Sequence, residues 1–404
     1  MTGVKSDPFG LLGQVLDGQF RIDELVGEGG SSVVYRGEHV GFEAKVAIKC
    51  LKLQSQLGSA LVETFLRRFR DEGRMAYRLS QGHFHIVRCL AIGTTIAPKS
   101  SSLVPYTVLE WLDGHSLARQ FEERRRAAGQ GRPLADLLKM LDPAADALGY
   151  AHGQGVTHRD LNPGSIFLVQ GRDGLQAKVL DFGLAKMAGE HPMASGGDAA
   201  AATAFRVFSP AYAAPEQFDE QLGAIGPWTD VYSLAMLLLE GMRDQPPFLG
   251  LSLEDLRQKI LDPKARPTPR NLGVVVSDEV QTVFGRALAL KPSDRVQDAS
   301  AFWSALKLAC DARLPVQFSR PLPDATQRMD ALPFSDRLPL YDDAPLRDDA
   351  PTVRDEREMQ VQSSGPAVQR PAVQQPAAQS PRTEKAILDE DTTIDERLEG
   401  TLPA

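Results

Sequence analysis

From Phe20 onward, the chain first alternates hydrophobic and polar positions with the period of β-strands. Three such runs, 20–30, 31–40 and 45–51, follow one another, and a cluster of glycines joins the first two. A similar run occupies 106–112. The segment 59–80 instead has apolar residues at helical spacing, namely Leu61, Phe65, Phe69, Ala76 and Leu79. The pattern predicts a small, strand-rich region that contains one amphipathic helix.

After Asp113 the hydrophobic period becomes that of α-helices. It predicts helices over 134–155, 229–242, 277–290 and 298–310. The most apolar run, "SLAMLLLEGM", is much shorter than the about 20 residues that cross a membrane, so it predicts a buried helix and no membrane span. The fold class is therefore α+β with two lobes. We expect an N-lobe at about 20–113, a C-lobe at about 114–314, and the functional site in the cleft between them.

The composition changes again beyond Leu314. Prolines recur every few residues, and a later stretch is rich in Pro, Gln and Ala, so few residues there could form a core. We expect a folded domain over 20–314, a short leader over 1–19, and a disordered tail over 315–404. The part from Pro321 onward has 17 acidic and 9 basic residues and carries the whole net charge of −8. A neutral domain with an acidic tail does not have the positive charge of nucleic-acid-binding proteins.

The first residues contain no long apolar segment of the kind that signal peptides have. The three cysteines, Cys50, Cys89 and Cys310, lie far apart in the sequence and form no Cys-x-x-Cys pair. This spacing argues against a zinc site and against a disulfide framework. We therefore expect a cytoplasmic protein in a reducing environment.

The glycine cluster reads "GEGGSSVVY" from Gly27 to Tyr35. Glycines allow a backbone to approach phosphate oxygens closely, but the same pattern also suits a simple hairpin turn. The motif "VAIK" in the next strand ends at Lys49, which could lie on the surface or point at a nucleotide phosphate in the cleft. These two motifs alone leave the alternatives open.

Glu72 favours the phosphate-binding interpretation of Lys49. It lies three residues after Phe69 and four before Ala76, so it shares the inward face of the predicted helix. A buried carboxylate needs a partner, and Lys49 is the expected one. The alternative is that Glu72 lies at the rim of this face.

Two further motifs supply aspartates after strand-like segments. Asp160 ends the triplet "HRD", and Asp181 begins "DFG" 21 residues later. Two carboxylates so placed suit one proton acceptor and one metal ligand, whereas the alternative is two polar residues in turns.

Together these motifs, in this order, resemble the eukaryotic-type protein kinases, and most closely the bacterial serine/threonine kinases. The resemblance covers about Phe20 to Cys310 and includes "VLEWLDG", "YAAPEQ", "TDVYSLAMLLLEG" and "ALALKPSDRVQDASAF". It implies the two-lobed kinase fold, with ATP and Mg²⁺ or Mn²⁺ bound between the lobes. It also implies transfer of the γ-phosphoryl group to serine or threonine hydroxyls of protein substrates and of the kinase itself.

The resemblance also implies roles for single residues. Lys49, held by Glu72, would bind the α- and β-phosphates, Asp160 would accept or orient the substrate proton, and Asp181 would bind the metal. Two structural roles follow as well: Glu216 would pair with Arg295, and Asp230 would brace the catalytic loop. Leu109 would be the gatekeeper behind the adenine. The implied ATP-binding residues are Gly27, Glu28, Gly29, Gly30, Val34, Ala47, Lys49, Glu110 and Leu112.

Three positions depart from the family pattern. Ser32 replaces the third glycine of the loop, Asn162 replaces a lysine of the catalytic loop, and Ser165 replaces the asparagine that binds the second metal ion. An amide can donate hydrogen bonds to phosphate, and a hydroxyl can bind Mg²⁺. Loss of one preorganised donor costs about 10²–10³ in kcat. We therefore expect a slow kinase, and the alternative is an impaired pseudokinase that binds ATP as a scaffold.

The activation segment between Asp181 and Glu216 contains two candidate phosphorylation sites, Thr203 and Ser209. In the family, an arginine placed like Arg159 often pairs with a phosphate on this segment. For Ser209 the alternative is a packing role in the substrate pocket.

The tail contains two further candidate phosphorylation sites, Thr352 and Thr392. Each follows acidic residues and precedes an aspartate at the third position, Asp355 or Asp395. This arrangement resembles the ligands of forkhead-associated domains and predicts such a partner. Two threonines that fall by chance in an acidic, solubilising tail are the open alternative.

Overall fold

The computed structural model describes residues 7–30, 32–53, 59–127, 129–171, 174–182, 209–311 and 317–318. For 59–61 and 317–318 it describes the backbone alone. Apart from the short strand β11 (Gln317–Phe318), which pairs with β10 (Val274–Val275), the predicted tail lies outside these residues. Thr203 and both tail threonines lie outside them as well.

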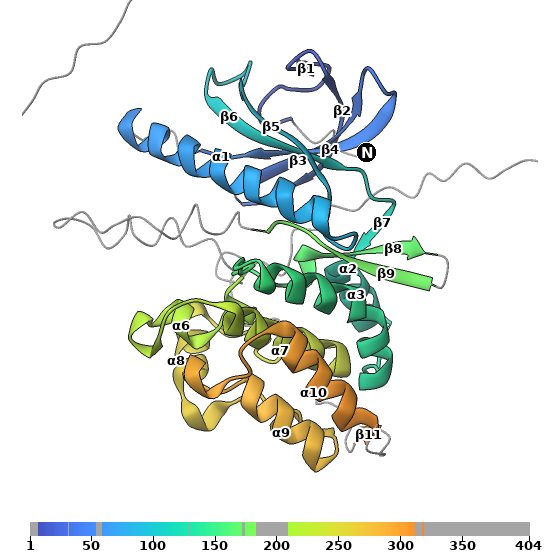
Figure 1. The fold of residues 1–404 in the computed structure, drawn as a ribbon, viewed down its shortest axis with the longest axis vertical. Coiled ribbons are helices and arrows are strands. Elements are labelled where there is room, and N and C mark those ends of the chain that lie inside the picture. The colour runs from blue at the N-terminus through green and yellow to red at the C-terminus, as the bar shows by residue number, and fades with distance from the viewer. Residues whose placement is uncertain are drawn as a thin grey trace, which may run out of the picture. The chain divides into compact units, whose positions relative to one another are not determined.

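The described part of the N-lobe contains a six-stranded antiparallel sheet in the order β1-β2-β3-β4-β6-β5, with helix α1 (Ser59–Gly82) packed against it (Figure 1). Its strands are β1 (Val15–Leu16), β2 (Phe20–Glu28), β3 (Ser32–His39), β4 (Ala44–Leu51), β5 (Cys89–Ile96) and β6 (Leu103–Glu110). The four strands and the helix that the hydrophobic pattern predicted here are confirmed. The pattern did not predict β1 and β5, which lie at the two edges of the sheet.

Alternation along β4 determines which side chains reach the cleft. Val46, Ile48 and Cys50 are at most 1% exposed and belong to the core on one face of the sheet. Side chains alternate between the faces of a strand, so Ala47 and Lys49 point to the opposite face. The same period that builds the core therefore delivers Lys49 to the cleft.

Residues ahead of Phe20 contribute to the N-lobe core, although their composition suggested a leader. Phe9, Leu11 and Leu16 are buried in the same cluster as the strands. Asp7 is also buried, and its Oδ1 accepts a hydrogen bond of 2.6 Å from the hydroxyl of Tyr35. The described N-lobe thus begins at Asp7. A few apolar residues in a short segment carry too little periodicity for this packing to be predicted.

Helix α1 lies close to the sheet because Gly73 leaves room for it. A Cβ atom at Gly73 would come within 2.7 Å of the Ile92 side chain on β5. Phe69 and Leu79 are buried on the inward face, as predicted, and Glu72 between them is 5% exposed. The helix therefore holds a carboxylate at the inner side of the cleft.

Helices dominate the C-lobe (Figure 1). Leu234 to Leu239 on α7 are all fully buried, which explains why this helix is the most apolar run of the chain. The four helices that the sequence predicted are confirmed as α3, α7, α9 and α10. The described helices are α2 (Leu117–Arg126), α3 (Leu134–Gly153), α6 (Pro215–Phe218), α7 (Pro227–Arg243), α8 (Leu253–Leu261), α9 (Asp278–Ala287) and α10 (Ala299–Asp311).

A second sheet connects the C-lobe to the segment that follows α1. It consists of β7 (Gly114–Ser116), β8 (Ile166–Gly171) and β9 (Gly174–Val179). The Val179 amide donates to the His85 carbonyl, and the Val179 carbonyl accepts from the Val87 amide, at 2.8 and 2.9 Å. These bonds fix the strand that leads to Asp181. No helix in the described ranges has the length and apolar character needed to cross a membrane.

Candidate active site

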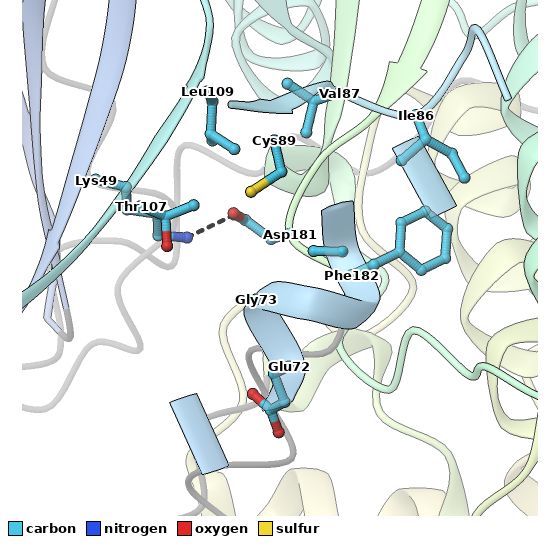
Figure 2. Close-up of a pocket in the computed structure, with 11 residues that line it drawn as sticks. Lys49, Glu72, Gly73, Ile86, Val87, Cys89, Thr107, Leu109, Asp181 and Phe182 are labelled. Carbon is cyan, nitrogen blue, oxygen red and sulfur yellow. Dashed lines mark ion pairs between the residues drawn. The ribbon is translucent and has the colours of Figure 1, made fainter. Parts of the chain in front are cut away.

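A small pocket of about 30 Å³ is lined in part by Leu109, the residue that the resemblance implied as gatekeeper (Figure 2). Side chains from β4, α1, β6 and the segment after β9 surround it, so residues far apart in the sequence meet here. The lining residues are Lys49, Glu72, Gly73, Ala76, Ile86, Val87, Cys89, Thr107, Leu109, Asp181 and Phe182. Lys49 and Glu72 were predicted to pair, and Asp181 was predicted to bind a metal ion in the cleft; all three line this pocket.

Lys49 forms its ion pair with Asp181, and the predicted pair with Glu72 is not formed between these described residues. The distance from Lys49 Nζ to Asp181 Oδ2 is 2.7 Å. In Figure 2 the carboxylate of Glu72 points away from this pair. The partner of Lys49 in this structure therefore differs from the predicted one, because the Asp181 carboxylate lies at the ammonium group while that of Glu72 is turned away.

The backbone at Asp181 adopts an unusual conformation. Its φ is +61°, in the left-handed region that non-glycine residues rarely adopt. This conformation is stabilised on both sides, because the Leu180 amide donates to the Ser165 carbonyl at 2.8 Å and the ring of Phe182 packs edge-on against His158. Such conformations cost about 1–3 kcal/mol and persist where the surroundings impose them, often at functional sites.

The catalytic loop is braced by Asp230, as the resemblance implied. Asp230 is fully buried on α7, and its two carboxylate oxygens accept hydrogen bonds from the amides of His158 and Arg159, at 2.7 and 2.8 Å. His152 contacts the same carboxylate at 2.8 Å. Arg159 has a φ of +72°, so a second strained residue directly precedes Asp160. The loop is therefore held in one conformation by a charge-assisted network.

Asp160 lies where the catalytic loop meets the end of the activation segment. Its Oδ1 accepts a hydrogen bond of 2.7 Å from the amide of Ser209. Burial raises the pKa of the Asp160 carboxyl above its ordinary value of 3.8, and the Ser209 amide opposes this shift. Ser209 is therefore close to the proposed base, while its phosphorylation stays a prediction.

Asn162 and Ser165, which replace two family residues, bind each other. Ser165 Oγ accepts from the Asn162 amide at 3.0 Å and donates to the Asn162 carbonyl at 2.8 Å. Asn162 Oδ1 accepts from the Gly164 amide at 2.8 Å, and its Nδ2 donates to the Asp160 carbonyl at 3.0 Å. Both side chains are buried and stabilise the loop itself. Neither side chain projects as a long, charged lysine would.

The glycine loop is tethered by Lys52, a lysine outside the predicted site. Lys52 contacts Glu28 Oε1 at 2.7 Å and donates to the Gly29 carbonyl at 2.9 Å. The Gly29 amide donates to the Ser32 carbonyl at 2.8 Å, which closes the turn. Val34 pairs with Lys49 across β3 and β4, so both face the cleft. Lys52 lies three residues after "VAIK". In the sequence, only its positive charge indicated that it could bind the glycine loop.

Below the catalytic loop, Glu216 and Arg295 form the predicted pair. Two parallel hydrogen bonds of 2.7 Å join the guanidinium to the carboxylate, and both side chains are fully buried. The pair anchors α6, which directly follows the segment that carries Ser209.

The donors in the cleft fit a divalent metal ion in part. Asp181 offers a carboxylate, and Ser165 is held next to it through the Leu180–Ser165 backbone bond, but its hydroxyl already makes two hydrogen bonds. The described residues contain no group of three or more His, Cys, Asp or Glu residues that could hold a metal ion. Mg²⁺ is commonly bound by one or two carboxylates together with substrate phosphates, and this donor set suits such a site.

Comparison with known proteins agrees with this geometry. A model of the protein kinase domain matches residues 20–305. The serine/threonine-protein kinase Pkn1 of Myxococcus xanthus is 33% identical over 324 residues, which are 78% of this chain and 42% of that protein. PknB of Mycolicibacterium smegmatis is 29% identical over 290 residues, 71% of this chain and 42% of that protein. The chain thus spans less than half the length of these two relatives.

Two further comparisons cover more of the matched protein. PknL of Mycobacterium bovis is 29% identical over 311 residues, 76% of this chain and 70% of that protein. The solved PknI kinase domain of Mycobacterium tuberculosis matches with a TM-score of 0.51 at 23% identity, over 74% of this chain and 100% of that one, which shows the fold. The extent of these matches, and the motifs in the cleft, lead to one conclusion: this chain belongs to the protein kinase family and has its two-lobed fold.

Proposed function

We propose that this chain is a serine/threonine protein kinase that transfers the γ-phosphoryl group of ATP to protein hydroxyls, including its own. The observation that carries the proposal is the 2.7 Å contact between Lys49 and Asp181 in the cleft pocket. The ammonium group of Lys49, which would bind phosphate, therefore lies next to the carboxylate of Asp181, which would bind the metal ion. Its relatives named above are serine/threonine kinases, which supports hydroxyl groups as the acceptors.

Binding of ATP requires Lys49 and Asp181 to exchange partners. The Lys49 ammonium would leave the carboxylate for the α- and β-phosphates, and Glu72, buried on the other side of the pocket, would then be its counterion. Asp181 would bind Mg²⁺ or Mn²⁺, which neutralises charge on the phosphate oxygens when it is bound. In the ion pair seen here, the opposite charges of the two groups compensate each other.

Asp160 would accept the proton of the substrate hydroxyl. The buried carboxyl near Ser209 has a raised pKa, which strengthens it as a base once it is ionised. Lowering the pH protonates this group and removes the acceptor.

As the pH falls, kcat/KM is therefore expected to decrease with a midpoint above pH 3.8, the ordinary pKa of an aspartate. Initial rates at low ATP and substrate concentration give kcat/KM, and circular dichroism at each pH verifies the fold. A folded protein whose kcat/KM stays constant down to about pH 4 would contradict the shift.

Ser165→Asn is expected to raise activity and to lower the metal concentration for half-maximal rate. An asparagine side chain is longer and offers a carbonyl oxygen to the cation, whereas the Ser165 hydroxyl is occupied by Asn162. Magnesium and manganese titrations of the initial rate test this. Ser165→Ala, which removes the hydroxyl without adding a ligand, is the matched control. An unchanged metal dependence in both variants would exclude Ser165 as a metal ligand.

The tail offers sites that the same kinase domain could modify. Thr352 and Thr392 lie on the same chain as the active site, so their effective concentration is high. Phosphorylation would add about −1.5 to −2 charge at each site, and Asp355 or Asp395 would supply the contact at the third following position. We expect at least one of them to be phosphorylated and then to bind a forkhead-associated domain.

Mass spectrometry after incubation with ATP locates these sites. Binding of the phosphorylated peptide to a forkhead-associated domain, compared with the same peptide carrying Asp355→Ala or Asp395→Ala, tests recognition. Phosphate on Thr203 or Ser209 with an unmodified tail would refute the recruitment proposal.

The kinase proposal itself is tested by incubation of the full chain with labelled ATP, with magnesium and with manganese in parallel. We expect slow labelling of serine or threonine. Labelling no greater than that of Asp181→Ala, with either metal, would exclude phosphoryl transfer.

A further inference from the structure

A buried lysine outside the assigned catalytic groups contacts the end of β6, which leads into the segment 110–113 between the two lobes, called the hinge below. Lys178 on β9 is 5% exposed, and its Nζ lies 2.6 Å from Oε1 of Glu110, the last residue of β6. Its ammonium group also lies 4.6 Å from the centre of the Phe84 ring. A buried charge in such surroundings needs its counterion, so this ion pair constrains both strands.

The Glu110 carboxylate connects three segments of the chain: β6, β9 and the segment that follows α1. Besides Lys178, its Oε1 accepts a hydrogen bond of 2.9 Å from the amide of Arg88, and the Glu110 amide donates to the Arg88 carbonyl at the same distance. Arg88 belongs to the segment that follows α1, and β9 leads to Asp181 three residues beyond Lys178. The Glu110 side chain therefore connects the hinge to the segment after α1, through Arg88, and to β9, through Lys178.

We propose that Lys178 is a positioning residue for nucleotide binding, acting through Glu110. This inference rests on the proposed function, in which the backbone groups of Glu110 and Leu112 bind adenine. The position of these backbone groups depends on the orientation of Glu110. The Lys178 ammonium and the Arg88 amide fix this orientation by binding Oε1 of its carboxylate. Such a role concerns adenine binding, which is the same in the ground state and the transition state, so it acts on the KM for ATP and not on kcat.

Lys178→Met tests the proposal in the full chain, because methionine keeps most of the length of the side chain and removes the charge. We expect the KM for ATP to rise about tenfold, with kcat changed less than about twofold. Lys178→Arg keeps the cation and is expected to leave KM within about threefold of the wild-type value. The matched control is Lys307→Met, which breaks the ion pair with Asp142 on the surface, where both side chains are 49% exposed.

A double-mutant cycle separates this role from a merely structural one. Glu110→Gln keeps an acceptor for the Arg88 amide and removes the charge that Lys178 pairs with, so it should raise KM by a similar factor. The double variant should then show no more than about the effect of one change, because both act through one contact. The melting temperature of each variant is measured, and all assays are run below the lowest one. The variants are then compared as folded proteins.

Two outcomes would overturn the proposal: an unchanged KM in Lys178→Met, with or without a fall in kcat, or fully additive effects in the double variant. The dissociation constant for ADP is measured in parallel by calorimetry and is expected to rise with the KM. If the wild-type chain binds ADP but transfers no phosphate, the proposed function fails and the positioning role is still decided by ADP binding.

Discussion

Asp160→Asn is expected to reduce kcat by about 10²–10⁴-fold, the usual contribution of a positioned general base. The asparagine keeps the shape of the side chain, and its amide oxygen can still accept the hydrogen bond from the Ser209 amide. It cannot accept a proton at neutral pH. The fold should therefore persist while the chemical step slows, and initial rates with labelled ATP at saturating substrate measure the change.

Lys49→Met tests the same phosphoryl-transfer step through a different residue. It removes the cation that ATP is proposed to take from Asp181, so we expect a loss of about 10²–10³ in kcat. Asp146→Asn is the control, because Asp146 contacts only the side chain of His83 among the hydrogen bonds described for it and is 75% exposed. Wild-type rates in Asp160→Asn or Lys49→Met would contradict the assigned roles.

Much of the fold was predictable because the hydrophobic period changes at the boundary between the lobes. The alternating run at 45–51 became β4, and it delivered Lys49 to the cleft because Val46, Ile48 and Cys50 occupy the core face. The burial of Glu72 followed in the same way from its spacing on α1. Periodicity therefore predicts the face on which a side chain lies.

Periodicity does not predict which residue on a second element a side chain meets. Glu72 and Asp181 both line the pocket. Which of them forms the ion pair with Lys49 depends on how α1 and the segment after β9 are placed, and in this structure it is Asp181. For the same reason, the resemblance flagged Asn162 and Ser165 as departures but did not predict that they bind each other. Lys178 carried a visible signal, since it is the one charged residue in the strand "GLQAKV", but its partner Glu110 is 68 residues away.

Arg295→Met is expected to lower the free energy of unfolding by about 3–5 kcal/mol, the largest stability effect that the structure predicts. Arg295 and Glu216 are both fully buried and joined by two hydrogen bonds of 2.7 Å. The guanidinium also donates to the carbonyls of Ala289 and Leu290, at 2.7 and 3.0 Å. Methionine fills much of the space but leaves the Glu216 carboxylate in the interior, with Thr229 Oγ1 as its remaining donor among the described hydrogen bonds.

Midpoints of guanidinium-induced unfolding at neutral pH measure this effect. The double variant Glu216→Gln with Arg295→Met should recover part of the loss, because no ionised carboxylate then remains buried. Lys307→Met, from a surface ion pair, should change stability by only about 0–1 kcal/mol. Equal effects of Arg295→Met and Lys307→Met would show that burial does not decide the strength of these pairs. Since α6 follows the segment that carries Ser209, the variant should also weaken protein-substrate phosphorylation at temperatures below its unfolding transition.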